Sequence, residues 1–382
     1  PDACDVDIEL DGVSLVSFYA LPEDNSIGNV LNSIVEFAPG VLGEGTSASY
    51  INDMWLGSII SIERENGYWI LTDGATDLEV EGTPTDPNLE YDLHIYTNLI
   101  SYPFWGSAPI DETIPTEAQA SIDAIIGEGT AALNIGTGWI GGLINLSGTK
   151  GYWFNTNSAV SFSYNPPVVG AARQSSPILP VPVEYSFFQS TQQAFYFINS
   201  ATFAGEPIQE EDLIIAYNGD IIVGSRYWYG DVTDVPAMGV YDGESYSGYC
   251  ETGDKVTFKI LDASTGKLID MVVDGDITWE NNSISVINLT DEFIPTEIGL
   301  SNAYPNPFNP ITTLSYDVPT DMNVLLGIYD VRGRLVEELV NGICAQGSYE
   351  VVWNADQHAT GVYMVKLVAE SSVKLQKIML IK

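Results

Sequence analysis

The first 165 residues contain four sequence blocks that each occur twice. LVSF at 15–18 recurs as LISY at 99–102, GEGT at 43–46 recurs at 127–130, WLG at 55–57 recurs as WIG at 139–141, and GYWI at 67–70 recurs as GYWF at 151–154. All four pairs are separated by 84 residues. Because chance rarely places four blocks in one register, this stretch is a tandem duplication, and the fold must accommodate two copies of one unit.

Each copy has the pattern of a small sheet with one helix. Apolar spacing predicts a helix over 29–37 in the first copy and over 116–126 in the second, where Thr116 would be the N-cap. The Trp block and the Tyr-Trp block predict antiparallel strands, and their recurrence at equivalent positions favours one ring of each Tyr-Trp pair in the core. The sequence therefore predicts two β-rich units, repeat unit one at 1–91 and repeat unit two at 92–165.

Proline residues mark a change of organisation after the duplication. Residues 166–183 form a proline-rich linker, because proline fixes φ and donates no ladder hydrogen bond. From 184 to 290, short alternating runs separated by Asn-Gly and Asp-Gly turn signals predict a β-sandwich module. A second linker at 291–298 leads to a last β module at 299–382. The predicted fold class is thus mainly β and multi-domain.

Acidic side chains greatly outnumber basic ones. There are 52 Asp and Glu residues against 13 Lys and Arg, which gives a formal net charge of -39. Such a chain has few cations for phosphate groups, which argues against nucleic acid or an anionic membrane surface as a partner. The 21 Tyr and 8 Trp residues indicate a folded protein, because disordered acidic chains lack aromatics. The start at Pro1 is expected of a mature chain whose export signal has been removed.

Thiols and imidazoles are too sparse for a metal or redox centre. Cys4, Cys250 and Cys344 include no CxxC pair. Three cysteines allow one disulfide bond and one free thiol, but their spacing does not identify which two would pair. Of the two histidines, His358 lies in the last module and His94 lies between the repeats, where a partly exposed strand residue is the expected role. No cofactor is therefore expected.

The last module carries an ordered set of sequence blocks. They are Tyr304, Pro305, Asn306, Pro307, Phe308, Asn309 and Pro310 near its start, then Gly333, Trp353, Gly361, Tyr363, Lys377 and the terminal Lys382. Together these blocks closely resemble the type A C-terminal sorting domain of the type IX (Por) secretion system, and the resemblance covers the whole module.

This resemblance implies a fold, a partner and a location. The fold is a seven-stranded immunoglobulin-like sandwich, the partner is the type IX secretion machinery, and the destination is the cell surface or the medium after passage through the periplasm. Sorting domains of this type are commonly cleaved, whereas this chain runs through Lys382. Residues 1–165 and 185–289 also resemble uncharacterised repeats that precede such domains in secreted bacterial surface proteins, a likeness that carries no known activity.

The strongest candidate for a binding surface is an aromatic cluster in the β-sandwich module. It consists of Arg226, Tyr227, Trp228 and Tyr229. Four bulky residues in succession on a strand must place some side chains outward, and planar aromatics on a β surface hold sugars or anchor protein interfaces. Core filling is the alternative for all four.

Carboxylates are the remaining candidates for chemistry. Asp5, Asp7, Asp274 and Asp276 are weak Ca²⁺ candidates, since they alternate along the chain but match no EF-hand loop, and structural calcium is left open. A hydrolase could use the run Glu210, Glu211 and Asp212, or the pair Asp231 and Asp234. For both sets, we expect acidic side chains on the surface and no catalytic role.

The preferred hypothesis is a secreted, non-enzymatic structural or adhesive protein of the cell surface, with self-assembly into a filament or coat left open. The alternative is a carbohydrate-binding module that uses the aromatic cluster, and a carboxylate-dependent hydrolase comes third. The apolar alternation of Val6, Ile8 and Leu10 predicts an N-terminal strand that either pairs within repeat unit one or completes a sheet in a neighbouring subunit.

Overall fold

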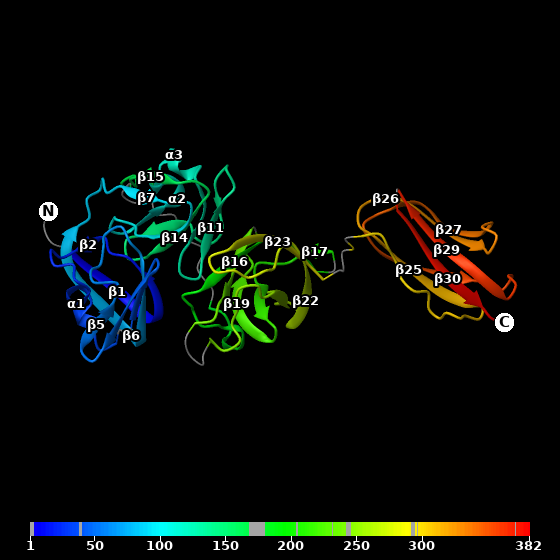
Figure 1. Ribbon diagram of the computed structural model, residues 1–382, viewed down its shortest axis with the longest axis horizontal. Coiled ribbons are helices and arrows are strands. Elements are labelled where there is room, and N and C mark those ends of the chain that lie inside the picture. Colours follow the sequence, from blue (N-terminus) through cyan, green and yellow to red (C-terminus); the bar gives the residue numbers. More distant parts are fainter. Residues whose placement is uncertain are drawn as a thin grey trace. The chain divides into compact units, whose positions relative to one another are not determined.

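The computed structural model describes residues 4–37, 40–167, 180–203, 205–230, 232–241, 246–291, 295, 297–370 and 372–382. As the sequence predicts, the described chain is mainly β, with several sheets and three short α-helices. It divides into two compact units, Pro1–Thr290 and Asp291–Lys382 (Figure 1). Most of the proline-rich linker lies outside the described residues, and the finer boundaries within the first unit stay predictions.

Repeat unit one is built on a curved antiparallel sheet. Its strand order is β1 (Cys4–Val16), β6 (Tyr68–Pro84), β3 (Gly40–Gly43), β4 (Thr46–Ile51) and β5 (Met54–Gly57), and β2 (Ala20–Leu21) also pairs with β6. The N-terminal strand β1 pairs with β6 of the same chain, with Val6 opposite Val80 and Ile8 opposite Leu78. It therefore pairs within repeat unit one, which is the first of the two arrangements that the sequence allowed.

Repeat unit two repeats this plan with shorter strands. Its main sheet has the order β12 (Trp139–Ile140), β11 (Ala131–Asn134), β10 (Ile122–Ile126), β14 (Tyr152–Thr156) and β8 (Tyr96–Ile100). Two small ribbons complete the unit, β9 (Ser107–Pro109) with β13 (Asn145–Ser147), and β7 (Tyr91–Leu93) with β15 (Val160–Phe162).

The helices are shorter than the sequence predicts. In repeat unit one, α1 (Ile27–Val30) is followed by a 3₁₀ turn at Asn32–Ile34, and these two segments take the place of the predicted helix over 29–37. In repeat unit two, α2 (Ile110–Thr113) and α3 (Thr116–Gln119) are single turns, and Pro115 occupies the N-cap position predicted for Thr116. The predicted helix over 116–126 is wrong beyond Gln119, because its β-branched end forms strand β10 between β11 and β14.

The two repeat units face each other across a local two-fold axis. Near this axis, a Cβ atom built on Gly67 would lie 3.2 Å from the Cα of Gly151, and a Cβ on Gly151 would lie 3.2 Å from the Cα of Gly67. The Gly67 amide donates to the Leu99 carbonyl at 3.2 Å, and the Gly151 amide donates to the Leu15 carbonyl at 3.2 Å. Each contact is matched by its 84-residue equivalent, so the interface is isologous within one chain.

The glutamate of each GEGT block forms a hydrogen bond across this interface. Glu44 accepts a hydrogen bond from the Leu99 amide at 2.9 Å, and Glu128 accepts one from the Leu15 amide at 3.0 Å. Each glutamate thus binds the backbone of the other repeat unit. The Tyr-Trp block divides in the same way, because the buried Tyr68 faces its own core whereas Trp69 packs into the inter-repeat cluster.

The third module is one continuous eight-stranded sheet that folds over its own core. Its order is β17 (Glu206–Pro207), β16 (Gln193–Phe203), β23 (Ile284–Thr290), β22 (Lys267–Asp274), β21 (Thr257–Asp262), β18 (Leu213–Asn218) and β19 (Ile221–Tyr227), and β20 (Thr233–Met238) pairs with β16. Side chains from β16, β18, β20, β21 and β23 form one buried apolar cluster with Trp279.

A buried polar network joins repeat unit two to the third module. The carboxylate of Asp234 is fully buried and accepts hydrogen bonds from the amides of Ala131 at 2.9 Å and Gly142 at 2.7 Å and from the Thr130 hydroxyl at 3.1 Å. The guanidinium of Arg226 lies 3.6 Å from this carboxylate and also donates to the carbonyl of Gly129. A buried ion pair with this many partners fixes one docking geometry between the two modules.

The second compact unit is a two-sheet sandwich of seven strands. One sheet has the order β24 (Gly299–Leu300), β25 (Ile311–Val318) and β28 (Gly347–Asn354), and the other has β27 (Leu335–Cys344), β26 (Met322–Asp330), β29 (Gly361–Ala369) and β30 (Ser372–Leu380). Alternate residues of both sheets face a common core that includes the fully buried Trp353. The number and arrangement of strands agree with an immunoglobulin-like sandwich.

Candidate functional site

The most clearly built site is the C-terminal edge of the second unit, where a proline-rich loop covers the last strand. Asn306 donates its side-chain amide to the Lys377 carbonyl at 3.1 Å and accepts the Met379 amide at 3.0 Å. Phe308 continues this pairing, because its amide donates to the Met379 carbonyl at 2.9 Å and its carbonyl accepts the Ile381 amide at 2.9 Å. The loop therefore occupies backbone groups that an edge strand would otherwise expose.

The same loop is anchored in the core through aromatic rings. The ring of Phe308 lies 5.3 Å from that of Trp353, and Trp353 meets Tyr363 edge-on at 5.3 Å. The Trp353 indole nitrogen donates to Glu337 at 2.8 Å, and the Tyr363 hydroxyl donates to the Ala359 carbonyl at 2.8 Å. Residues far apart in the sequence thus meet around the loop and the last strand.

The remaining motif residues hold turns and ends. Gly333 has φ of 74° in the β26–β27 turn, a conformation that favours glycine. In this turn the backbone amide of Arg334 binds Asp330 and lowers the pKa of that carboxyl group. Lys382 donates its amide to the Thr360 hydroxyl at 3.2 Å, which closes the terminus onto the start of β29 at Gly361.

Within the loop, Tyr304 is exposed, whereas the carbonyl groups of Pro305 and Pro310 are hydrogen-bonded. Tyr304 is 82% exposed, the carbonyl of Pro305 accepts the Thr312 hydroxyl at 2.8 Å, and the carbonyl of Pro310 accepts the Ala355 amide at 2.9 Å. The peptide bonds that precede Pro305 and Pro307 are both cis. Among the motif residues that the structure describes, Tyr304 is thus the one aromatic ring left largely in solvent.

The second compact unit is thus a seven-stranded sandwich whose N-terminal loop covers its C-terminal strand. Residues 302–382 match the family model described as a secretion system C-terminal sorting domain. The last module belongs to that family, as the sequence resemblance indicated. It marks the chain as a type IX secreted protein that engages the secretion machinery and is exported to the cell surface or extracellular space.

Comparisons of the whole chain add little to this assignment. No curated protein matches it. Among solved structures, it is similar to the dimeric latent PorU from Porphyromonas gingivalis, with 11% identity and a TM-score of 0.20 over 91% of this chain and 30% of that chain. The chain thus spans under a third of that protein, and a TM-score this low does not indicate a common overall fold. Within the described ranges, no helix combines the length and the apolar character needed to cross a membrane.

The aromatic cluster at 226–229 is not an exposed surface, contrary to the sequence prediction. Arg226 and Trp228 are each only 8% exposed, and Tyr227 and Tyr229 are half-buried. Trp228 packs in the core of the third module, and Tyr227 packs beside the second small cluster around Leu213. Core filling, together with the ion pair of Arg226, accounts for these residues.

Two of the hydrolase candidates, Asp212 and Asp234, have structural roles. Asp212 is buried and accepts the amides of Gln209 at 2.8 Å and Ala263 at 2.9 Å, while Asp234 joins two modules as described above. Asp231 lies outside the described residues. Glu210 and Glu211 are exposed on the turn that precedes β18.

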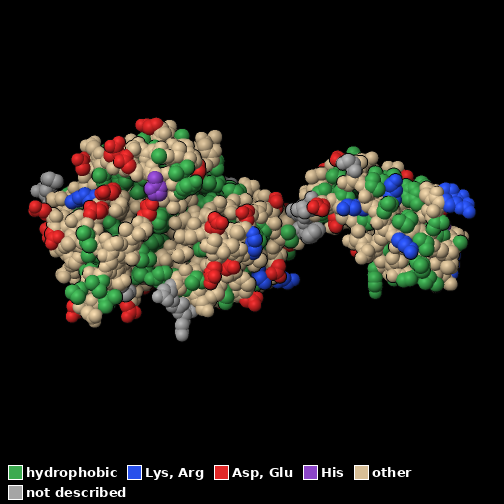
Figure 2. All heavy atoms as spheres, viewed as in Figure 1, with side chains coloured by type: hydrophobic (Ala, Val, Ile, Leu, Met, Phe, Trp, Pro, Cys, Tyr) green, Lys and Arg blue, Asp and Glu red, His purple; other side chains and the backbone are tan. Residues whose placement is uncertain are grey.

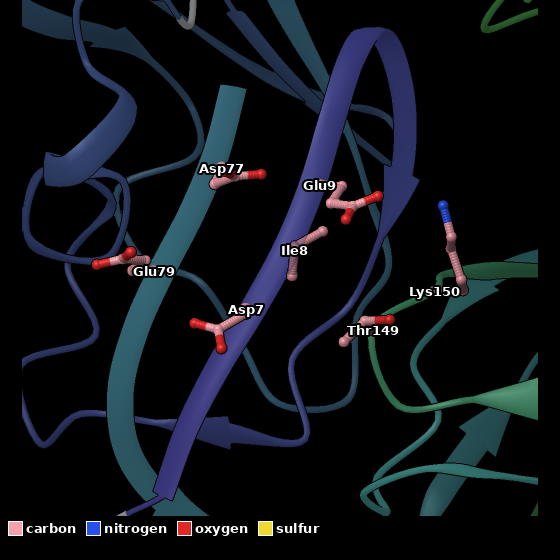
Figure 3. A pocket seen from close by; sticks show the side chains of 7 residues that line it. All are labelled: Asp7, Ile8, Glu9, Asp77, Glu79, Thr149 and Lys150. Carbon is pink, nitrogen blue, oxygen red and sulfur yellow. The ribbon is translucent and has the colours of Figure 1, made fainter. Parts of the chain in front are cut away.

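Acidic side chains of repeat unit one line an open groove that is bordered on its other side by repeat unit two. Directly opposed pairs on β1 and β6 are Asp5 with Glu81, Asp7 with Glu79, and Glu9 with Asp77. Four of these carboxylates, with Ile8, Thr149 and Lys150, border a groove of about 580 Å³ (Figure 3). The ladder is costly to stability, because like charges directly opposite each other on two strands repel.

The structure gathers no calcium cage from these residues. In the described part of the chain, no group of three or more His, Cys, Asp or Glu side chains is placed to hold a metal ion. Asp276 instead accepts the Thr278 hydroxyl at 2.7 Å, and Asp274 accepts the Asn288 side-chain amide at 3.4 Å. Asp5 and Asp7 point outward from β1 along the acidic ladder.

We expect Glu79→Lys to stabilise the first unit by about 0.5–1 kcal/mol, because it replaces a repulsive cross-strand pair with an attractive one. Thermal unfolding should shift upward by about 2 °C. Glu23→Lys makes the same charge change at an exposed position outside the ladder, and it measures the general benefit of a less negative chain. Equal shifts for the two variants would show that the opposed pair itself costs nothing.

All three cysteines are free thiols, which answers the pairing question that spacing left open. Cys250 is 1% exposed, and burial raises its pKa to about 12, whereas Cys4 and Cys344 are half-buried. Since the thiolate is the reactive form, we expect alkylation at about pH 8 to modify Cys4 and Cys344 and to spare Cys250 until denaturant is added. Mass spectrometry of the labelled peptides checks this, and fast labelling of Cys250 in the native protein would contradict it.

His94 ties the two repeat units together at their rim. Its ring lies outside strand β7, largely exposed, and Nε2 is 2.7 Å from a Glu44 carboxylate oxygen. The hydrogen bond with the Ile95 carbonyl, and then that with Glu44, raise the pKa of His94. A role in holding the repeats fits these contacts better than a catalytic one.

Proposed function

We propose that this chain is a non-enzymatic structural or adhesive protein of the bacterial surface, delivered by its sorting module. The observation that carries the proposal is the sorting-domain family match together with the rigid joining of the preceding modules. The two repeat units share an isologous interface, and the Asp234 network fixes repeat unit two to the third module. Such locked β modules suit a load-bearing or displayed body better than a hinged cleft.

The test is to express the full chain in a type IX-secreting bacterium and to locate it by immunoelectron microscopy. We expect labelling of the outer surface or of extracellular material, and we expect it to be lost when Asn306→Ala removes both side-chain bonds to the last strand. An Asn302→Ala variant in the same loop serves as control, because Asn302 bonds only a side chain. Retention of the wild-type chain inside the cell would defeat the proposal.

A carbohydrate-binding function is the second candidate, and a different surface now favours it. Trp105 is 78% exposed and borders a groove of about 490 Å³ with Tyr19, Phe104 and three prolines, in addition to Cys4, Asp5 and Thr85. The amide of Gly148 donates to the Gly106 carbonyl at 3.0 Å, which holds the loop that presents the indole. A rigid exposed indole can stack on a sugar ring.

Pull-down on insoluble polysaccharides tests this candidate. Retention that is lost with Trp105→Ala but kept with Phe188→Ala, which removes an aromatic ring that is 62% exposed and does not line the groove, would support it. Equal behaviour of wild type and Trp105→Ala on every polysaccharide would remove it.

A further inference from the structure

The two repeat units differ at one aromatic position beside their interface. Trp105 lies 84 residues after Leu21, and each lies three residues after the repeated LVSF or LISY block. Leu21 is 1% exposed and pairs with Thr83 where β2 meets β6, whereas Trp105 is 78% exposed. The plan common to both repeats therefore does not require an exposed indole at this position, which indicates that the ring has a use outside the core.

The loop that carries Trp105 packs tightly against its surroundings. A Cβ atom built on Gly148 would clash with the Phe104 carbonyl oxygen, so the two backbone segments lie in direct contact. On the other side, the Tyr19 hydroxyl donates to the Asp5 carbonyl at 2.6 Å. Trp105 and these neighbours border the groove of about 490 Å³, and the indole is presented from a fixed backbone.

The acidic groove of about 580 Å³ adjoins this aromatic groove. Asp5 borders the aromatic groove, and Asp7 and Glu9, the next residues on the same face of β1, border the acidic one. Thr149, which borders the acidic groove from repeat unit two, directly follows Gly148 (Figure 3). From Asp5 to Glu9 the row extends about 13 Å along the strand, the length of a short oligosaccharide. We call the two grooves together the β1 track.

The β1 track is strongly negative. Five carboxylates and one lysine border it, and this Lys150 already lies 3.2 Å from Glu128. Figure 2 shows more acidic than basic side chains over the first unit, and residues 1–165 hold 24 acidic and 2 basic side chains. Opposed carboxylates on β1 and β6 repel each other in the free protein. A cationic ligand that lies along the two strands relieves this repulsion.

We propose that the β1 track binds a polysaccharide of amino sugars whose amino groups are free and protonated. One sugar ring stacks on Trp105, whose face also attracts an ammonium group, and the amino groups of the following rings lie along the carboxylates. Uronic-acid and sulfated polysaccharides are repelled, and a neutral one leaves the carboxylates without partners. The rigid indole at the end of the row favours a sugar over a basic peptide, because its flat face matches that of a sugar ring.

This inference rests on the carbohydrate-binding candidate and names the class of glycan. The test is isothermal titration calorimetry of the full chain with hexasaccharides of glucosamine, N-acetylglucosamine and galacturonate, in mildly acidic buffer that keeps the sugar amines protonated. We expect a Kd of about 10–100 µM for the glucosamine hexamer in about 0.02 M NaCl, and binding about tenfold weaker in about 0.5 M NaCl. The N-acetylglucosamine hexamer should bind at least about tenfold more weakly, and the galacturonate hexamer should not bind.

Two substitutions test the two parts of the β1 track. Trp105→Ala should weaken binding of the glucosamine hexamer about tenfold, and Phe188→Ala, which removes a ring that is 62% exposed outside the groove, should not. Glu79→Lys should weaken it about tenfold although it stabilises the fold, so this loss cannot come from unfolding. Glu23→Lys makes the same charge change away from the track and should have a much smaller effect. Circular dichroism confirms that all four variants fold.

The outcomes separate this inference from the candidate on which it rests. Equal affinity for the glucosamine and N-acetylglucosamine hexamers, lost with Trp105→Ala, would overturn the amino-sugar class and keep carbohydrate binding. Hexalysine that binds as tightly as the glucosamine hexamer and is insensitive to Trp105→Ala would overturn it in favour of a basic peptide. Equal losses with Glu79→Lys and Glu23→Lys would also overturn it. No binding of any hexasaccharide would remove both, and the proposed surface location would still be decided by microscopy.

Discussion

Asp234→Ala should destabilise the first compact unit by about 3–5 kcal/mol. The carboxylate is fully buried, and its removal leaves Arg226 with an uncompensated charge and leaves the amides of Ala131 and Gly142 without their acceptor. Removing one partner of a buried ion pair lowers the free energy of unfolding strongly, because the other charge is left buried without a partner. Replacing both partners by apolar residues has a much smaller effect. Denaturant unfolding of the full chain, followed by tryptophan fluorescence, measures the loss.

The matched control is Asp270→Ala. Asp270 also pairs with a cation, since Lys259 lies 2.8 Å away, but its side chain is 84% exposed. An exposed pair is worth about 0–1 kcal/mol, so this variant should unfold almost as the wild type does. If Asp234→Ala proved as stable as Asp270→Ala, the network would not be what joins the two modules.

Trp353→Ala should cost the sorting module about 3–5 kcal/mol, a large part of the stability of a domain of this size. The indole is fully buried, contacts Phe308 and Tyr363, and donates to Glu337. We therefore expect the module to be largely unfolded at 37 °C and export to fall with it. Calorimetry of the full chain should show the module's transition shifted downward while that of the first unit is unchanged.

Val352→Ala provides the comparison for this substitution. Val352 precedes Trp353 on β28, but its side chain is 60% exposed on the opposite face of the sheet. It should change the transition by no more than about 0.5 kcal/mol. A similar loss for both variants would mean that the core around Trp353 tolerates a cavity, contrary to its packing.

The duplication and the sorting module could be predicted because short blocks of consecutive residues identify both. The docking of the two repeats could not, although its residues lie in the repeated blocks. Glu44 and Glu128 bind backbone amides that lie 55 and 113 residues away, and no local pattern announces such a partner. The recurrence of GEGT was the available signal, because a glutamate present in both copies of a turn indicates that its carboxylate has a specific partner.

The aromatic cluster shows the opposite failure. A run of four bulky residues on a strand must divide between two faces, and one face of an edge sheet is normally wet. Here Trp228 faces the core of the third module, Arg226 on the same side reaches repeat unit two, and Tyr227 on the other side packs beside the cluster around Leu213 and stays half-buried. The contact of Arg226 arises from docking between modules, which strand alternation does not encode.

The second predicted helix failed for a related reason. Residues 122, 125 and 126 fall at helical spacing, but all three are isoleucine, whose branched Cβ suits a strand. Pairing with Phe154 and Trp153 on β14 completes the sheet there. The short segment fits both helical spacing and a strand, and pairing with β14 selects the strand.

The isologous contact between the repeats has a consequence for how they hold together. Because both partners belong to one polypeptide, each meets the other at an effective concentration in the millimolar range, set by the short tether. An affinity far too weak to keep separate molecules together is then sufficient. If repeat units one and two were produced as independent chains, their pairing would depend on concentration, and an unpaired copy would expose Trp69 or Leu99 to water.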